Sequence, residues 1–168
     1  MKRTVLKFGL YGAFTICILF LVSWFIFGNL PYSTQEVLGY ASMILSLGFV
    51  FLGIKYYRDK ENEGRVRFKT ALLIGVFISL ITAVAFGILD LIYTEVLNPD
   101  FMTEYYDRSA DSLKASLPPD LVEQKLMELE AQRELFSNPL MSFALMAMTV
   151  FVIGFIISLL SALILQRK

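Results

Sequence analysis

Four long apolar runs constrain the fold of this 168-residue chain more than any other feature. They cover about residues 8–28, 37–54, 70–92 and 140–165. A helix needs about 20 apolar residues to cross a bilayer. The chain is 57% hydrophobic, whereas a soluble domain is normally about 45 to 50% apolar. The sequence therefore predicts an all-α integral membrane four-helix bundle, a single membrane domain over residues 1–168.

The first apolar run could also belong to a secretory signal peptide, because Lys2, Arg3 and Lys7 precede it. A signal peptide has an apolar stretch of only about 7 to 15 residues and then a cleavage site of small residues. Here the apolar stretch extends from Phe8 to Phe27, and Gly28-Asn29-Leu30-Pro31 is not a cleavage pattern. We expect a retained first helix that ends at this glycine and proline.

The distribution of Lys and Arg predicts the topology, because basic residues near helix ends stay on the cytoplasmic side. The N-terminus, the segment 55–69 and the C-terminus hold three, six and two basic residues. The connection 28–36 holds none, and the segment 98–139 holds four against nine acidic residues. We therefore expect both termini and a basic loop 55–69 in the cytoplasm, an extracytoplasmic acidic segment 98–139, and a multi-pass protein of the cell inner (cytoplasmic) membrane.

The acidic segment 98–139 is expected to form a hairpin of two amphipathic helices. Asn98 can cap the first helix with Pro99 at its first position, and Pro118-Pro119 should end that helix and begin the second. Two helices of under about twenty residues bury too little surface to fold alone, so the hairpin must pack on the bundle or on a partner. The expected apolar faces are Met102, Tyr106, Ala110, Leu113 and Leu117 on the first helix, and Val122, Leu126, Leu129 and Phe136, interrupted by Arg133, on the second.

Small residues recur at four-residue spacing in the third and fourth runs, where they allow helix backbones to approach closely in lipid. We expect them to form packing seams inside the bundle. The alternative is that the stripe on the third run is a self-association face. The stripes are Gly75, Ser79, Ala83 and Gly87 in the third run and Gly154, Ser158 and Ala162 in the fourth.

Asp90 is the one ionisable residue within an apolar run, and such a residue is by default a functional hypothesis. About twenty helical residues from Thr70 correspond to about 30 Å, the hydrocarbon thickness, which would place Asp90 at the outer interface. We expect a solvated or hydrogen-bonded carboxylate there, with Tyr93 and Thr94 as its nearest partners. The alternative is an ion or proton site.

The basic loop has two interpretations. The topology rule alone requires positive charge between two crossings. A contact with lipid headgroups or with protein is the alternative, because each basic residue near an anionic surface contributes about 1 kcal/mol. The six residues concerned are Lys55, Arg58, Lys60, Arg65, Arg67 and Lys69.

Residue types that carry most catalysis and metal binding are scarce. The chain has no histidine, and its single cysteine, Cys17, lies in an apolar run and is expected to be a small packing residue. No Asp-x-Asp-x-Asp-Gly spacing indicates a calcium loop in the acidic segment. We expect no catalytic residues, no metal, no cofactor and no nucleic-acid partner, and therefore not an enzyme.

Four stretches of the chain resemble a known family. The sequence is similar to uncharacterised four-helix bacterial membrane proteins of Bacteroidetes type, which are grouped only as a domain of unknown function. The resemblance implies a multi-pass inner-membrane protein and supplies no catalytic residue. It is carried by Gly53-Ile54-Lys55-Tyr56-Tyr57-Arg58-Asp59-Lys60 with Gly64 and Phe68, by Asn98-Pro99-Asp100-Phe101, by Asn138-Pro139, and by Ser158-Leu159-Leu160-Ser161-Ala162-Leu163-Ile164-Leu165.

Two functions are consistent with these observations. The first is a non-enzymatic membrane protein that acts through helix packing and through contacts of its extracytoplasmic hairpin, with an extracytoplasmic protein partner or with itself as a homo-oligomer. The alternative is a small transporter or channel subunit with Asp90 near the outer end of the third helix. Transporters usually have broken or polar helices at mid-membrane, and these runs hold only scattered Ser and Thr. In both cases the lipid bilayer is a partner.

Overall fold

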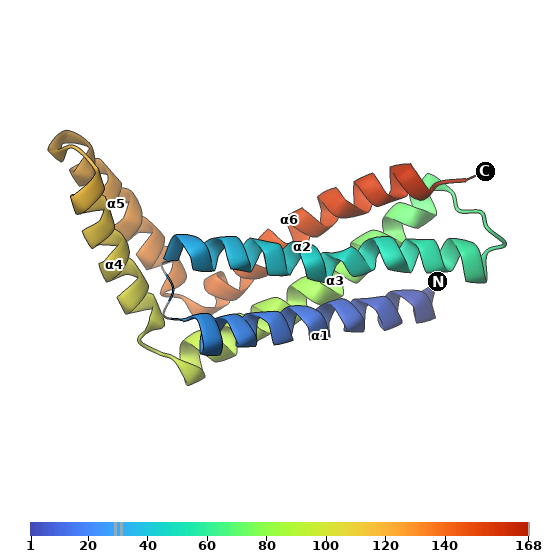
Figure 1. The fold of residues 1–168 in the computed structure, drawn as a ribbon, viewed down its shortest axis with the longest axis horizontal. Helices are drawn as coiled ribbons and strands as arrows, with labels where there is room; N and C mark the ends of the chain where they lie inside the picture. Colours follow the sequence, from blue (N-terminus) through green and yellow to red (C-terminus); the bar gives the residue numbers. More distant parts are fainter. Residues whose placement is uncertain (29, 31, 168) are drawn as a thin grey trace. The chain divides into compact units, whose positions relative to one another are not determined.

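The computed structural model describes residues 1–28, 30 and 32–167, and within them the fold is all-α (Figure 1). Helices α1 and α2 begin earlier than the predicted 8 and 37, because a helix continues beyond the apolar part that a membrane needs. Two π-helical turns, η1 and η2, extend α2 and α3. The elements are α1 (Lys2–Phe27), α2 (Tyr32–Tyr56), η1 (Tyr57–Glu61), α3 (Phe68–Ile92), η2 (Tyr93–Leu97), α4 (Phe101–Ser116), α5 (Pro119–Phe136) and α6 (Pro139–Leu165).

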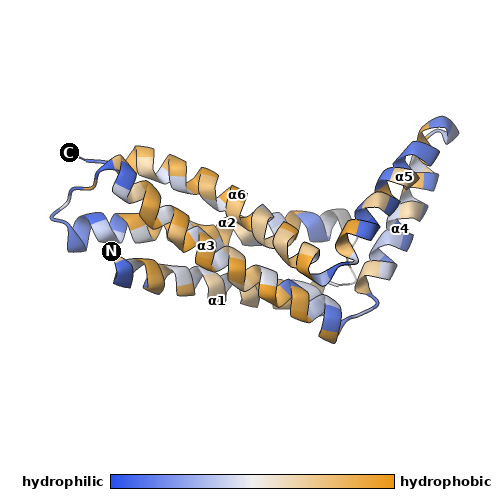
Figure 2. Ribbon diagram, turned by 180° about the vertical axis from the view of Figure 1, so that it is seen from behind, coloured by the Kyte–Doolittle hydropathy of each residue, from blue (hydrophilic) through white to orange (hydrophobic). Residues whose placement is uncertain are grey.

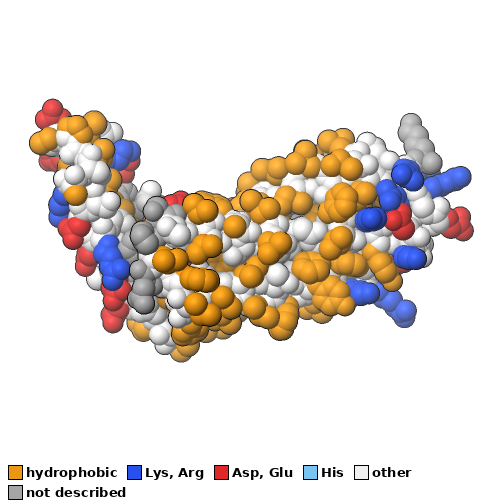
Figure 3. Space-filling model, viewed as in Figure 1, with side chains coloured by type: hydrophobic (Ala, Val, Ile, Leu, Met, Phe, Trp, Pro, Cys, Tyr) orange, Lys and Arg blue, Asp and Glu red, His pale blue; other side chains and the backbone are white. Residues whose placement is uncertain are grey.

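Within the described residues, four helices are long and apolar enough to cross a membrane, as the four apolar runs predicted. The candidate spans are Lys2–Phe27, Thr34–Glu61, Phe68–Leu97 and Pro139–Leu165. Hydrophobic residues dominate these helices, whereas α4 and α5 are largely hydrophilic (Figure 2). Large apolar side chains also cover the outward surface of the long helices (Figure 3). An apolar surface of this extent is typical of contact with lipid.

The chain divides into two compact units, and both α3 and α6 contribute residues to each. The first unit comprises Met1–Phe86 with Met146–Lys168, and the second comprises Gly87–Leu145. The single membrane domain over residues 1–168 therefore stays a prediction. Each unit is described below by itself.

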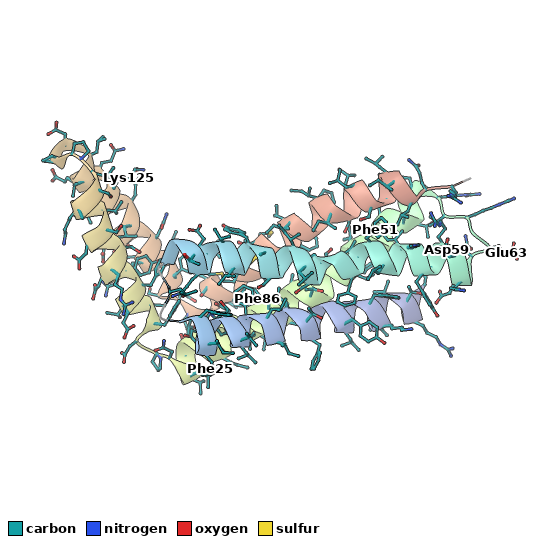
Figure 4. The ribbon with its side chains drawn as sticks, in the orientation of Figure 1. Phe25, Phe51, Asp59, Glu63, Phe86 and Lys125 are labelled. Atoms are coloured by element: carbon teal, nitrogen blue, oxygen red, sulfur yellow. The ribbon has the colours of Figure 1, made fainter. Side chains whose placement is uncertain are left out.

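The first unit is held together by fully buried aliphatic side chains. Phe20 of α1 packs against Phe86 of α3 with 4.3 Å between the ring centroids, and Phe86 is labelled in Figure 4. These contacts join helices that are far apart in sequence. The fully buried aliphatic residues include Ile16, Leu47, Val50, Ile54, Ile74, Ile78 and Val150.

The helix ends in the second unit show which of the predicted capping and proline positions begin a helix. Pro118-Pro119 ends one helix and begins the next, as predicted. Asn138 caps α6 because its Oδ1 accepts hydrogen bonds from the backbone amides of Leu140 at 3.0 Å and Met141 at 3.3 Å.

The same dipeptide type at Asn98-Pro99 does not start a helix, so this prediction is wrong. The N-cap of α4 is Asp100, and α4 begins at Phe101. Asn98 instead closes η2, because its backbone amide donates to the carbonyl oxygen of Tyr93 at 2.8 Å. Its side-chain nitrogen donates to the hydroxyl of Tyr93 at 3.3 Å, and among the described residues its Oδ1 accepts no hydrogen bond from an amide of α4.

Candidate functional site

Asp90 of α3 lies inside the second unit and is only 6% exposed. Ser142 of α6 donates a hydrogen bond from its Oγ to Asp90 Oδ2 at 3.4 Å. Of the two forms that the sequence allowed, a solvated or a hydrogen-bonded carboxylate, the structure has the hydrogen-bonded one, and it is buried. The reason is that α6 supplies cover that the sequence of α3 alone does not reveal.

Among the described residues, the hydrogen bond to the Asp90 carboxylate comes from Ser142 and not from the predicted partner Thr94. Thr94 donates from Oγ1 to the backbone carbonyl of Asp90 at 3.0 Å and to that of Leu91 at 3.4 Å. Ser142 was missed because it lies 52 residues away in sequence. In the described part of the chain no Lys or Arg forms an ion pair with Asp90. The arrangement is a buried carboxyl with a hydroxyl neighbour, which can hold or exchange a proton.

A groove of about 740 Å³ lies between α4 and α5 in the second unit. Its apolar wall includes Tyr106, Ala110, Leu126 and Leu129, all on the faces predicted from helical spacing. No residue of α5, every one of which is described, is fully buried. The two helices therefore contact each other but leave their shared apolar face incompletely covered.

Tyr106 is the most buried residue of α4 and lines the groove. Its ring packs edge-on against Tyr105, with 5.3 Å between the centroids. Burial raises the pKa of the Tyr106 phenol above its ordinary value, and the neighbouring Tyr105 adds to this, whereas Arg133 opposes it. The phenol is therefore neutral at physiological pH and acts as a neutral hydrogen-bonding group at the groove wall.

Charge on the α4–α5 pair is distributed unevenly. Each of its four basic residues pairs with an acidic residue on its own helix: Arg108 with Glu104, Lys114 with Asp111, Lys125 with Glu128 and Arg133 with Glu130. The remaining acidic residues make no ion pair with a described residue, so they carry the net charge of −5 of the segment 98–139. Two of them, Asp107 and Glu123, line the groove.

The small-residue stripes of α3 and α6 face each other in the first unit. A Cβ added at Gly75 would lie 2.7 Å from Ser158 Cβ, and one added at Gly154 would lie 2.6 Å from Ser79 Cβ. The hydroxyls of Ser79 and Ser158 are 3.2 Å apart. Ala83 and Ala162 are also buried in this unit, and Gly87 is buried in the second. The structure therefore places the α3 stripe against α6 of the same chain.

The six basic residues of the segment 55–69 fall into separate groups. Arg58 is buried, donates from Nε to Asp59 Oδ1 at 2.6 Å, and reaches the carbonyl oxygen of Leu165 at 3.5 Å. Arg65, Arg67 and Lys69 line a cleft in the first unit, joined by Arg167. Lys55 and Lys60 are exposed and lie outside it. Arg58 thus serves the fold, a role that the count of charges did not reveal.

The connection between α2 and α3 also holds both ends of the described chain. The N-terminal amine forms an ion pair with Glu61 at 2.8 Å, and Thr4 donates to the same carboxylate at 2.6 Å. At the other end, Val66 and Arg167 form an antiparallel bridge with backbone hydrogen bonds of 3.0 and 2.9 Å. These contacts gather residues from three parts of the sequence at one end of the first unit.

The fold and these sites define an all-α protein with four candidate membrane spans among the described residues, one of which carries a buried carboxyl group that is hydrogen-bonded to a serine of another. A model of the family described as protein of unknown function (DUF4199) matches residues 7–167, and the chain belongs to that family. This confirms the resemblance to a domain-of-unknown-function family. No curated protein and no solved structure matches the chain.

Proposed function

We propose that this is a non-enzymatic multi-pass protein of the cytoplasmic membrane whose α4–α5 pair, outside the cytoplasm, binds a helical segment of a protein partner. The observation that carries the proposal is the incompletely covered apolar groove between these helices. Apolar residues such as Val122, Leu126 and Leu129 remain half-exposed there. An amphipathic helix that lays its apolar face in a groove would complete this burial.

Charge specifies the partner further. Every basic residue of α4 and α5 is paired within its own helix, so the acidic residues that form no ion pair with a described residue set the local field. Asp107 and Glu123 at the groove favour a partner with Lys or Arg beside its apolar face. A second copy of the same acidic pair would meet like charge, so a basic segment of another protein suits the groove better.

The test uses the full chain in detergent micelles and two synthetic amphipathic helices with the same leucine face. One helix carries lysines beside that face and the other carries glutamates. We expect the lysine helix to bind and the glutamate helix not to bind. Ala110→Trp fills the groove and should abolish binding, whereas Ala131→Trp, on the exposed side of α5, should not.

Two results would contradict this proposal. One is equal binding of the lysine and glutamate helices, and the other is binding that Ala110→Trp leaves unchanged. A photo-crosslinker placed at Leu126 in native membranes adds an independent measurement. An adduct of twice the mass of the chain would identify a second copy of the chain as the occupant of the groove. The proposal of a basic partner would then be wrong.

The burial of Asp90 favours a second candidate, a small transporter or channel subunit. Burying an ionisable residue within a membrane span costs free energy, and residues of this kind commonly mark ion or proton pathways. Proton or cation flux into liposomes that contain only this protein would support it, provided that Asp90→Asn stops the flux and Asp100→Asn, on an exposed residue, does not. Absence of flux from the unmodified protein rejects this candidate.

A further inference from the structure

The basic end of the first unit contains a cleft of about 1050 Å³ whose charged lining is entirely positive. Arg65, Arg67 and Lys69 come from the connection between α2 and α3, and Arg167 comes from the residues after α6. Among the described residues, none of these four forms an ion pair with a carboxylate. Four cations that line one cleft and form no ion pair with a described residue are suited to an external anion.

The backbone explains why these side chains converge. Val66 is only 1% exposed and is held by two hydrogen bonds to Arg167. Because side chains alternate along an extended segment, burial of Val66 directs Arg65 and Arg67 outward, and both are exposed. The same bridge holds the backbone of Arg167 next to Val66, and Arg167 lines the cleft together with Arg65 and Arg67. The positive end of the α3 dipole lies at this point as well, since α3 begins at Phe68.

The acidic residues of the connection do not neutralise the cleft. Asp59 binds Arg58 through two hydrogen bonds of 2.6 and 3.1 Å, although it also lies within electrostatic reach of Arg167. Glu61 is taken up by the N-terminal amine and Thr4. Glu63 lies in a left-handed turn at φ 52° followed by Gly64 at φ 79°, and it does not line the cleft. Asp59 and Glu63 are labelled in Figure 4.

We propose that Arg65, Arg67, Lys69 and Arg167 form a binding site for a phosphate group, as carried by an anionic phospholipid headgroup. Guanidinium groups match the geometry of phosphate oxygens and are weakly hydrated, so three arginines are suited to a phosphate group. The cleft lies between the end of one candidate membrane span, at Glu61, and the beginning of the next, at Phe68. A headgroup phosphate is found at that depth.

The test measures lipid binding to the full chain in mixed micelles that hold phosphatidylglycerol and phosphatidylcholine in equal amounts, with bound lipid counted by native mass spectrometry. We expect the unmodified protein to retain phosphatidylglycerol in preference. The triple variant Arg65→Gln, Arg67→Gln and Arg167→Gln should bind it about a hundredfold more weakly, since each of the three basic residues contributes about a factor of five near an anionic surface.

The matched control removes the same charge outside the cleft, by Lys2→Gln, Arg3→Gln and Lys60→Gln. It should change binding by less than about twofold, because diffuse charge at a surface is screened. Equal losses in the two triple variants, or no preference for phosphatidylglycerol in the unmodified protein, would overturn the proposal. The second of these results needs no variant and therefore does not depend on variant folding.

A separate arm identifies the source of the phosphate. Inorganic phosphate is added to the unmodified protein in a neutral detergent, and its protection against thermal unfolding is compared with that of phosphatidylglycerol. Protection by the lipid alone assigns the site to a headgroup, and protection by both, lost in the cleft variant, assigns it to phosphate in general. Protection by neither overturns the proposal.

Discussion

At the scale of single residues, backbone approach between α3 and α6 depends on the absence of side-chain atoms at two glycines. Gly75 and Gly154 each face a serine of the opposite helix at a distance that leaves no room for a methyl group. Gly48 of α2 has nothing within 4 Å of the position its Cβ would occupy. In the sequence all three are simply small residues. Only the contacts in the structure distinguish a glycine at the α3–α6 interface from one that has room for a side chain.

Gly75→Ala should destabilise the protein by about 1 to 3 kcal/mol, because overpacking a close contact forces the helices apart. Gly48→Ala should be neutral or stabilising, since alanine exceeds glycine in helix propensity by about 1 kcal/mol. Unfolding in detergent micelles gives both values. Adding Ser158→Gly to Gly75→Ala should recover part of the loss, because it removes the atoms that clash. Equal effects of the two single alanine variants would show that the seam is not tight.

At the scale of elements, two Asn-Pro pairs of the same kind have different structural roles. Asn138 caps α6 with its side chain, whereas Asn98 ends η2 with its backbone and gives its side chain to Tyr93. Asn98 directly follows η2 and is its C-cap, whereas α5 ends at Phe136, two residues before Asn138. An Asn-Pro pair therefore starts a helix only where the asparagine does not also end the preceding one.

Asn138→Ala should weaken the first turn of α6 by about 1 kcal/mol, the usual value of an N-cap. Hydrogen exchange at the backbone amides of Leu140 and Met141 should accelerate, because these two amides donate to the side-chain Oδ1 of Asn138. Asn138→Asp keeps the acceptor oxygen and should keep exchange slow. Unchanged exchange at both amides in the alanine variant would mean that the cap has no energetic role.

At the scale of the whole molecule, the positions of charge and of apolar surface lead to one orientation. The end of the first unit that carries the N-terminal amine, Arg65, Arg67 and Arg167 is basic, and the segment 98–139 is acidic. Basic residues near helix ends favour the cytoplasmic side. We therefore keep the prediction that both termini are cytoplasmic and that α4 and α5 are outside.

Cysteine accessibility tests this orientation in intact cells. In a chain with Cys17 replaced by alanine, Ser112→Cys on α4 should react with a membrane-impermeant maleimide added from outside. Asn62→Cys in the α2–α3 connection should react only after the membrane is opened. Both positions are exposed, so reactivity reports the side of the membrane and not burial. Labelling of Asn62→Cys in intact cells would reverse the topology.

The sequence by itself determined the four apolar spans, the break at Pro118-Pro119 and the half-buried faces of α4 and α5. These features depend on residues within one or two helical turns, and a local periodicity or a proline specifies them wherever the chain lies. The family assignment also follows from sequence alone.

Only the tertiary structure decided that Asp90 is buried against Ser142, that Arg58 serves the fold, and that Arg167 completes a cleft with Arg65 and Arg67. Each of these features joins side chains that lie far apart along the chain. In an apolar sequence many alternative pairings of helix faces have similar composition, so helix periodicity cannot select among them. The selection is made by close packing at the few small residues where two backbones can meet.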